Sequence, residues 1–165
     1  NMTDIFGEWN SDDQICEWIN SLVPTARNLI LTKRPERMVS LIRYDLYLLN
    51  RWYGITTENQ AKYDERMNIL RRLPDYVCNW ISCEPLLSEI NLRLDSFSVD
   101  WVVVGAESGA NRRPCKLEWV ESIVQACRKT GTPVFVKQLD INGKLVKDIT
   151  KFPPELQIRQ VPWNR

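Results

Sequence analysis

The sequence predicts an α/β protein built as a partial parallel (βα) barrel. Short β-branched runs alternate with amphipathic helical stretches, and this alternation recurs about every 25 residues, the length of one strand–loop–helix unit. A complete barrel of eight such units needs about 250 residues, whereas this chain has 165. We therefore expect a barrel that is incomplete at its N-terminal side. An open doubly wound sheet is the alternative, but the chain lacks the Gly-rich dinucleotide loop that would favour it.

Caps and apolar stripes mark the expected helices. Ser11 and Gln14 form a capping box in front of an apolar stripe, and Thr57 with Gln60 forms a second one. Pro35 stands at the favoured first-turn position of a helix. The four expected helices cover residues 11–23, 35–49, 57–73 and 117–129.

Five buried strands are expected between and after these helices, at residues 28–32, 52–56, 77–82, 101–105 and 133–141. Asn142-Gly143 is typical of a two-residue hairpin turn, and it separates the fifth strand from residues 144–149. The barrel pattern therefore ends in a hairpin. We expect one barrel domain over residues 1–150 and an extended C-terminal tail over residues 151–165.

Composition excludes several classes of function. Lysine and arginine number 22 against 21 acidic residues, so the net charge of +1 gives no general attraction to nucleic acid or to an anionic membrane. The absence of histidine removes Ser-His-Asp and Cys-His catalysis. No apolar run approaches the length of about 20 residues that a spanning helix needs. The five scattered cysteines suit reduced thiols, so we expect a cytoplasmic protein without a metal site of its own.

Polar residues follow every expected strand. In parallel α/β folds the loops after the strands meet at one edge and build the site. Each group alone is equally typical of a helix cap or a solvated loop, but together they predict a binding rim for a polar ligand. Three carboxylates and two lysines on that rim could hold a zwitterion and ribose hydroxyls; they are Glu58, Glu84, Glu107, Lys33 and Lys137.

Other residues have two readings each. Arg112 and Arg113 could hold a phosphate or carboxylate, or be a solvated pair. Cys83 could be a nucleophile, although a small buried hydrophobic side chain fits the position better. The tryptophans at strand starts and on helix faces are explained better by packing than by base stacking.

Six ordered motifs at the expected strand exits resemble the phage-associated gene-product 37/68 family of radical-SAM-like proteins. They are Asn-Met-Thr-Asp-Ile-Phe-Gly-Glu-Trp (1–9), Leu-Thr-Lys-Arg-Pro-Glu-Arg (31–37), Gly-Ile-Thr-Thr-Glu-Asn-Gln (54–60), Ser-Cys-Glu-Pro-Leu-Leu (82–87), Val-Val-Gly-Ala-Glu-Ser-Gly (103–109) and Val-Lys-Gln (136–138). Family members carry a C-x-x-x-C-x-x-C loop upstream of the first motif. The resemblance therefore implies a [4Fe–4S] cluster only in a longer form of the protein.

The resemblance also implies a role for each strand exit. This chain would supply the part of the barrel that lines the S-adenosylmethionine and substrate cavity. Thr3 and Asp4 would lie near the amino-acid end of S-adenosylmethionine, and Lys33, after Thr32, would pair with its carboxylate. The expected ribose contacts are Thr56, Glu58 and Asn59. The expected catalytic candidates, facing the substrate, are Glu84, Glu107 and Lys137.

Three functions are compatible with these expectations. The first is the cluster-less portion of a radical-SAM-type enzyme with an unidentified substrate, inactive as this chain alone. The second is a non-catalytic phage interaction module, in which an oligomer or a partner chain covers the open barrel edge. The third is a hydrolase that uses Glu58, Glu84 or Glu107 as acid and base. Association with phages suggests nucleic acid as a partner, which the near-neutral charge does not support.

Overall fold

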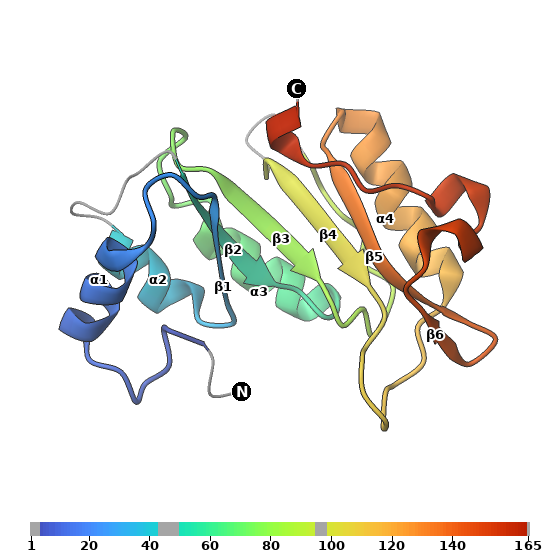
Figure 1. The fold of residues 1–165 in the computed structure, drawn as a ribbon, viewed down its shortest axis with the longest axis horizontal. Helices are drawn as coiled ribbons and strands as arrows, with labels where there is room; N and C mark the ends of the chain where they lie inside the picture. The colour runs from blue at the N-terminus through green and yellow to red at the C-terminus, as the bar shows by residue number, and fades with distance from the viewer. Residues whose placement is uncertain (1–3, 43–49, 95–98, 165) are drawn as a thin grey trace.

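The computed structural model describes residues 4–42, 50–94 and 99–164 of the chain, which form one six-stranded sheet (Figure 1). The strands lie side by side in chain order, β1 to β6. The first five are parallel, and β6 pairs with β5 in the antiparallel direction. Their bounds are β1 Asn28–Thr32, β2 Arg51–Thr56, β3 Asn79–Cys83, β4 Trp101–Gly105, β5 Val134–Ile141 and β6 Lys144–Val146.

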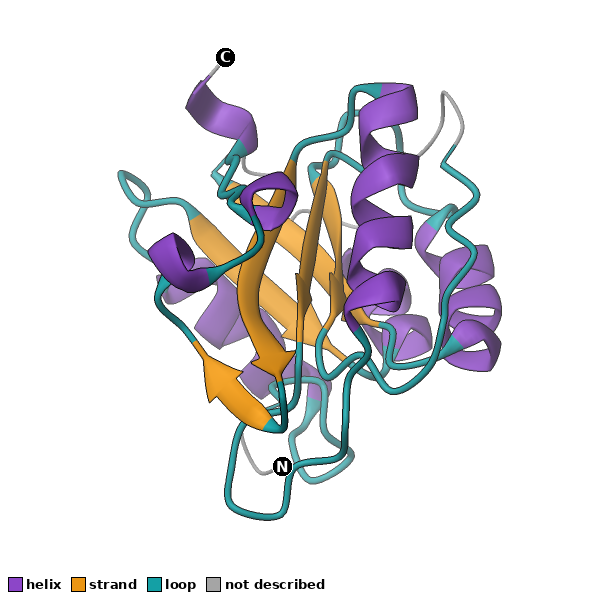
Figure 2. Ribbon diagram, turned by 90° about the vertical axis from the view of Figure 1, so that its right-hand side faces the viewer, coloured by secondary structure: helices purple, strands orange, loops and turns teal. Residues whose placement is uncertain are grey.

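Four α-helices are described, α1 Asp12–Ser21, α2 Pro35–Ile42, α3 Gln60–Leu70 and α4 Leu117–Thr130. Their buried residues join the strands in one large core on a single face of the sheet. The C-terminal tail lies along β5 (Figure 2), where Leu156 joins the core that α4 covers and Arg128 of α4 donates to the backbone oxygen of Glu155 at 3.1 Å. It contains three short 3-10 helices, Ile149–Lys151, Pro154–Leu156 and Pro162–Asn164. No helix in the described ranges is long and apolar enough to cross a membrane.

The expected partial parallel (βα) barrel is wrong. The sheet is mixed, because β6 runs antiparallel to β5, and it is bent into a half-barrel. The βα alternation also fails between β3 and β4, where residues 84–94 contain no helix. Leu86, Ile90 and Leu92 fill this part of the core from irregular backbone. Their spacing of four and then two residues does not give the apolar stripe that a helix needs.

The helix caps agree with the sequence in one case and differ in another. Ser11 caps α1, and its reciprocal contact with Gln14 completes the expected capping box. The expected box of Thr57 and Gln60 does not form, because Asn59 caps α3 instead and accepts a hydrogen bond from the backbone N–H of Lys62 at 3.0 Å. The expected extension of the second helix over residues 43–49 lies outside the described residues.

Tryptophans cover the face of the sheet that the helices leave open. Trp52, Trp80 and Trp101 form a second, smaller core on that face. The tail closes one end of it: Trp163 packs edge-on against Trp52 and Trp101, with ring centroids 5.6 Å apart in both pairs. Backbone hydrogen bonds join the tail to β5. Gln160 N donates to Val134 O at 3.0 Å, and Val136 N donates to Ile158 O at 2.8 Å. The expected extended tail is therefore partly helical and docked on the sheet.

Gly54 in β2 makes room for this aromatic layer. A Cβ atom at Gly54 would lie 2.4 Å from the Trp80 ring. We expect Gly54→Ala to lower the free energy of unfolding by about 2 kcal/mol, because the buried ring has to shift. Urea denaturation followed by far-UV circular dichroism measures this loss. Gly105→Ala is the matched control, since its Cβ would meet Gln138 at ordinary contact distances of 3.4 Å and more; equal losses in the two variants would contradict the packing argument.

Candidate functional site

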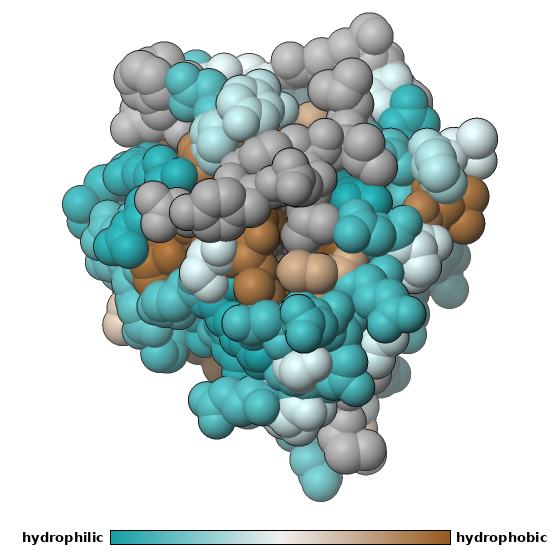
Figure 3. Space-filling model, turned by 90° about the vertical axis from the view of Figure 1, so that its left-hand side faces the viewer, coloured by the Kyte–Doolittle hydropathy of each residue, from teal (hydrophilic) through white to brown (hydrophobic). Residues whose placement is uncertain are grey.

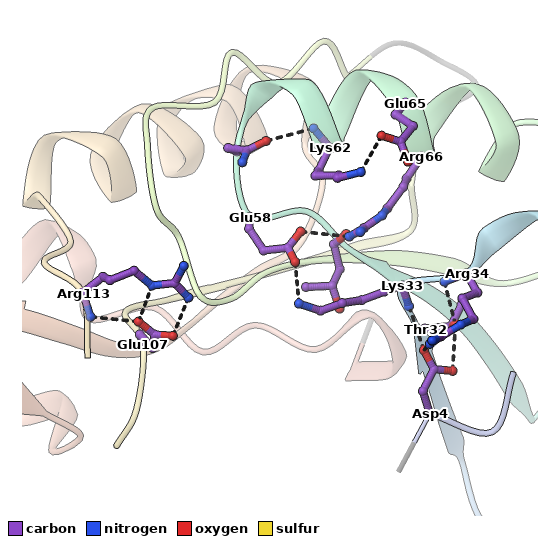
Figure 4. A network of polar contacts seen from close by, with 12 residues as sticks. Asp4, Thr32, Lys33, Arg34, Glu58, Lys62, Glu65, Arg66, Glu107 and Arg113 are labelled. Atoms are coloured by element: carbon purple, nitrogen blue, oxygen red, sulfur yellow. Dashed lines mark hydrogen bonds and ion pairs between the residues drawn. The ribbon is translucent and has the colours of Figure 1, made fainter. Parts of the chain in front are cut away.

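The carboxyl ends of β1 to β5 gather most of the residues that the sequence analysis selected. Figure 4 shows the part of this rim that contains Asp4, Glu58 and Glu107. Lys33, Glu58, Glu84 and Glu107 follow the four successive strands β1 to β4, and Lys137 lies in β5. Thr3 lies outside the described residues. The rim is not one cluster of carboxylates and lysines, because each carboxylate has its own cationic partner.

Asp4 serves as a structural anchor for the end of β1. Its carboxylate accepts hydrogen bonds from Thr32 Oγ1 at 2.8 and 3.0 Å and from the backbone N–H of Lys33 at 3.1 Å. Arg34 Nη1 adds an ion pair at 3.2 Å, and the backbone N–H of Phe6 donates at 3.1 Å. A carboxylate has about four acceptor sites. These contacts use the acceptor capacity of Asp4 within the protein.

Glu58 connects β1 to α3. Its Oε1 pairs with Lys33 Nζ and its Oε2 with Arg66 Nη1 at 2.8 Å. Burial alone raises the pKa of the Glu58 carboxyl, but the Lys33 hydrogen bond and the charges of Arg66 and Lys33 outweigh it and hold the pKa below its ordinary value. Arg66 is buried and also donates to the backbone oxygen of Thr56 at 2.5 Å. Glu58 is therefore an ionised anchor for a buried guanidinium.

Glu84 links the end of β3 to β5. Lys137 Nζ donates to Glu84 Oε2 at 2.9 Å, and Gln138 Nε2 donates to Glu84 Oε1 at the same distance. Gln138 is buried and also donates to the backbone oxygen of Ala106 at 2.6 Å. The side chain of Lys137 is 51% exposed, so two of its three N–H groups remain directed at solvent or a ligand.

Glu107 forms a local bidentate pair with Arg113. Arg113 Nε and Nη2 donate to the two carboxylate oxygens at 2.8 and 2.6 Å, and the backbone N–H of Arg113 adds a third contact at 2.8 Å. These hydrogen bonds lower the pKa of Glu107 to about 2. Arg113 is thus occupied by Glu107, and Arg112 donates to the backbone oxygen of Gly143. The positive charge of Lys33 also contributes to the low pKa of Glu107.

The remaining candidates have structural roles. Thr56 is buried and supplies its backbone oxygen to Arg66, while Asn59 caps α3. Cys83 is fully buried beside Thr57, with Sγ and Oγ1 3.2 Å apart, and burial raises the pKa of its thiol to about 12. A thiol with that pKa stays protonated at neutral pH. Cys83 is therefore a packing residue and not a nucleophile.

A hydrolase that uses the rim carboxylates as acid and base has little support. A general acid near neutral pH needs a raised carboxyl pKa. Cationic partners instead lower the pKa values of Glu58 and Glu107. Within the described ranges, no group of three His, Cys, Asp or Glu side chains could hold a metal ion.

Two cavities lie beside the rim and share Leu29 and Leu31 of β1. The first, here called the β1 cavity, has a volume of about 470 Å³. Its polar lining is Asp4, Thr32, Lys33, Arg34 and Thr56, and its apolar lining includes Trp18, Ile19 and Leu22. Four of the residues expected to bind the cofactor therefore line one cavity.

The second cavity, here called the tryptophan cavity, has a volume of about 510 Å³. It contains the catalytic candidates Glu84 and Lys137, but Glu107 does not line it. Ser82 and Gln138, which belong to the expected strand exits, line it too, whereas sequence reasoning missed Phe135, Lys147 and Arg159. Lys147 and Arg159 lie after the hairpin, where the chain returns over the sheet. Strand periodicity does not predict this return.

We expect Glu58→Gln to lower the free energy of unfolding by about 2 kcal/mol at pH 7, because it leaves the buried guanidinium of Arg66 without its charged partner. The folded-state pKa of Glu58 lies below the ordinary 4.5, so its contribution is present above that pH and is lost as the pH falls through the folded pKa. The difference between wild type and variant should therefore shrink below pH 4.5 in urea denaturation. Glu65→Gln, at an exposed pair with Lys62, is the control; a pH-independent difference for Glu58→Gln would contradict this assignment.

Comparison with known proteins gives a family but no function. No curated protein matches the chain, and no solved structure matches it. A family model described as a protein of unknown function (DUF5131) matches residues 1–153. This match does not test the resemblance to the gene-product 37/68 family, which stays a prediction. Because the match covers nearly the whole sequence, the chain belongs to the DUF5131 family of proteins of unknown function.

Proposed function

We propose that this chain is the S-adenosylmethionine- and substrate-binding part of a radical-SAM-type enzyme, a phage-associated protein by its resemblance. The observation that carries the proposal is the pair of adjoining cavities that share Leu29 and Leu31. Cofactor candidates line the β1 cavity and the catalytic candidates Glu84 and Lys137 line the tryptophan cavity. Leu29 and Leu31 form the wall between them, so two bound ligands would be neighbours.

The β1 cavity fits one end of S-adenosylmethionine better than the other. Its volume of about 470 Å³ is in the range of small-molecule sites. Lys33 is 51% exposed and spends one N–H on Glu58, which leaves donors for the methionyl carboxylate. Asp4 has no acceptor capacity left for the amino group. Lys33 would therefore hold the carboxylate, and the adenine ring would lie against the apolar wall that includes Trp18.

When bound beside a [4Fe–4S] cluster, S-adenosylmethionine supplies a carbon radical that abstracts hydrogen from a substrate. Among the described residues, no group of three His, Cys, Asp or Glu side chains could hold the cluster. The role left to this chain is to bind and orient the two organic ligands. Lys33 and the Leu29–Leu31 wall perform that role on the cofactor side.

We expect the purified chain to bind S-adenosylmethionine in isothermal titration calorimetry, and Lys33→Ala to weaken binding about tenfold, the effect of losing about 1.4 kcal/mol of charge pairing. Lys62→Ala is the matched control, because Lys62 is an exposed lysine paired with Glu65 and does not line the cavity. Absence of binding at millimolar ligand, or equal affinities of the two variants, would contradict the proposal.

A second candidate function, a non-catalytic interaction module, is favoured by the outer edge of β1. Asn28 N donates to Asn50 O, on the β2 side, at 2.7 Å, so the alternate residues Leu29 and Leu31 direct their backbone groups outward. The next outward N–H, that of Lys33, is already bonded to Asp4. Leu29 and Leu31 also expose 44% and 37% of their surface.

Figure 3 views the molecule from this side and shows hydrophobic surface exposed there. A strand added to β1 would pair with its outward backbone groups and bury these side chains. It would also fill the β1 cavity, which the same residues line. The cofactor and the added strand are therefore competing occupants.

The interaction module predicts self-association or a tightly held partner. Size-exclusion chromatography with multi-angle light scattering should then show a species heavier than the 19.4 kDa chain. Leu29→Lys should shift that species toward the monomer, because a charge on the outer strand opposes edge pairing. A wild-type chain that is monomeric at all concentrations would remove this candidate.

A further inference from the structure

The tryptophan cavity has an aromatic side whose polar atoms are already bonded. Trp80, Trp101 and Phe135 all line it. The indole N–H of Trp80 donates to Trp52 O at 3.2 Å, and that of Trp101 donates to Gln160 O at 2.9 Å. Trp80 and Trp101 each expose only 5% of their surface, and Phe135 is half-buried. What these rings offer a ligand is carbon surface without a free donor, which favours another planar ring.

The charged part of the cavity lining is mainly cationic. It consists of three cations, Lys137, Lys147 and Arg159, against the single carboxylate of Glu84. Lys137 and Glu84 form an ion pair at 2.9 Å. Arg159 is held in place by a hydrogen bond to Lys147 O at 2.8 Å and by the Phe135 ring, 5.4 Å from its guanidinium.

Lys147 is an exposed cation that lines the cavity. Within the described part of the chain its ammonium group makes no hydrogen bond or ion pair, so it is open to solvent or to a ligand. Lys137 satisfies Glu84, and one positive charge on Lys147 and another on Arg159 remain uncompensated in the lining. A cavity with two unneutralised cations attracts an anionic group.

The tryptophans and Lys137 are separated along the strands. Trp80 and Trp101 are register partners near the starts of β3 and β4. Lys137 and Gln138 lie nearer the other end of the sheet, where Gln138 is opposite Gly105 at the end of β4. Arg159 lies over the Phe135 ring. A ligand that stacks on the tryptophans would therefore reach Lys137 with a charge directed toward the rim.

We propose that the tryptophan cavity binds an organic anion that carries a planar aromatic ring, of the size of a mononucleotide. Its volume of about 510 Å³ is in the range of sites for such molecules. The inference deepens the proposed function by giving the chemical class of the substrate. That the bound anion is the substrate rests on the proposed function. Its binding in the cavity does not require S-adenosylmethionine.

The test is isothermal titration calorimetry with four probes: AMP, UMP, adenosine and ribose 5-phosphate. We expect both mononucleotides to bind, and adenosine and ribose 5-phosphate each to bind at least tenfold more weakly, because each lacks one of the two recognised groups. Adenosine binding as tightly as AMP would overturn the anion requirement. Ribose 5-phosphate binding as tightly as AMP would overturn the proposal. So would the absence of mononucleotide binding at about 10 mM ligand.

Two variants place the binding in this cavity. Lys147→Ala should weaken AMP binding about fivefold, whereas Lys144→Ala, an exposed lysine of the same hairpin that does not line the cavity, should leave it unchanged. Phe135→Leu keeps an apolar side chain and should weaken AMP more than ribose 5-phosphate. Equal effects of Lys147→Ala and Lys144→Ala would overturn the assignment.

A competition experiment separates this inference from the proposed function. S-adenosylmethionine binding that is lost in Lys33→Ala while AMP binding persists would support two cavities with different ligands. Displacement of AMP by stoichiometric S-adenosylmethionine would overturn the inference while leaving cofactor binding intact. AMP binding without any S-adenosylmethionine binding would support the inference and contradict the proposed function.

Discussion

Five parallel strands laid side by side in chain order bring every segment that leaves a strand to the same edge of the sheet. Residues separated by more than fifty positions, such as Glu84 and Lys137, become direct partners there. The same order puts tryptophans from neighbouring strands side by side on the open face. That layer requires a glycine at position 54, because the Trp80 ring occupies the space that a Cβ atom would need there.

Charge pairing at this edge determines what kind of ligand it suits. The carboxylates after β2, β3 and β4 are each neutralised by a lysine or an arginine of the chain itself. Ion pairs at a partly solvated edge hold side chains in position more than they add stability. Lys33 and Lys137, each with a side chain that is 51% exposed, keep unused donors beside these ion pairs. An edge rich in acidic residues by sequence is therefore, in three dimensions, a donor surface for anions.

Local signals in the sequence predicted much of the fold. Ser11 and Gln14 mark the start of α1, and the Asn142-Gly143 turn has the positive φ angles of 52° and 73° that such a hairpin requires. For the link between β3 and β4 the sequence predicted no helix, and Leu86, Ile90 and Leu92 fill the core there from irregular backbone whose course no local period encodes. The site was predicted only where it lies at strand ends. Arg159 comes from a tail whose docking depends on long-range packing, which no local period encodes.

The aromatic layer on the open face gives the protein an optical property of its own. Trp80 and Trp101 have ring centroids 5.4 Å apart, and Trp163 of the tail lies 5.6 Å from both Trp52 and Trp101. Indoles this close couple their electronic transitions, so the folded chain should carry an exciton couplet in its ultraviolet dichroism. Since one of the coupled chromophores belongs to the tail, the couplet would report detachment of the last few residues without any attached label.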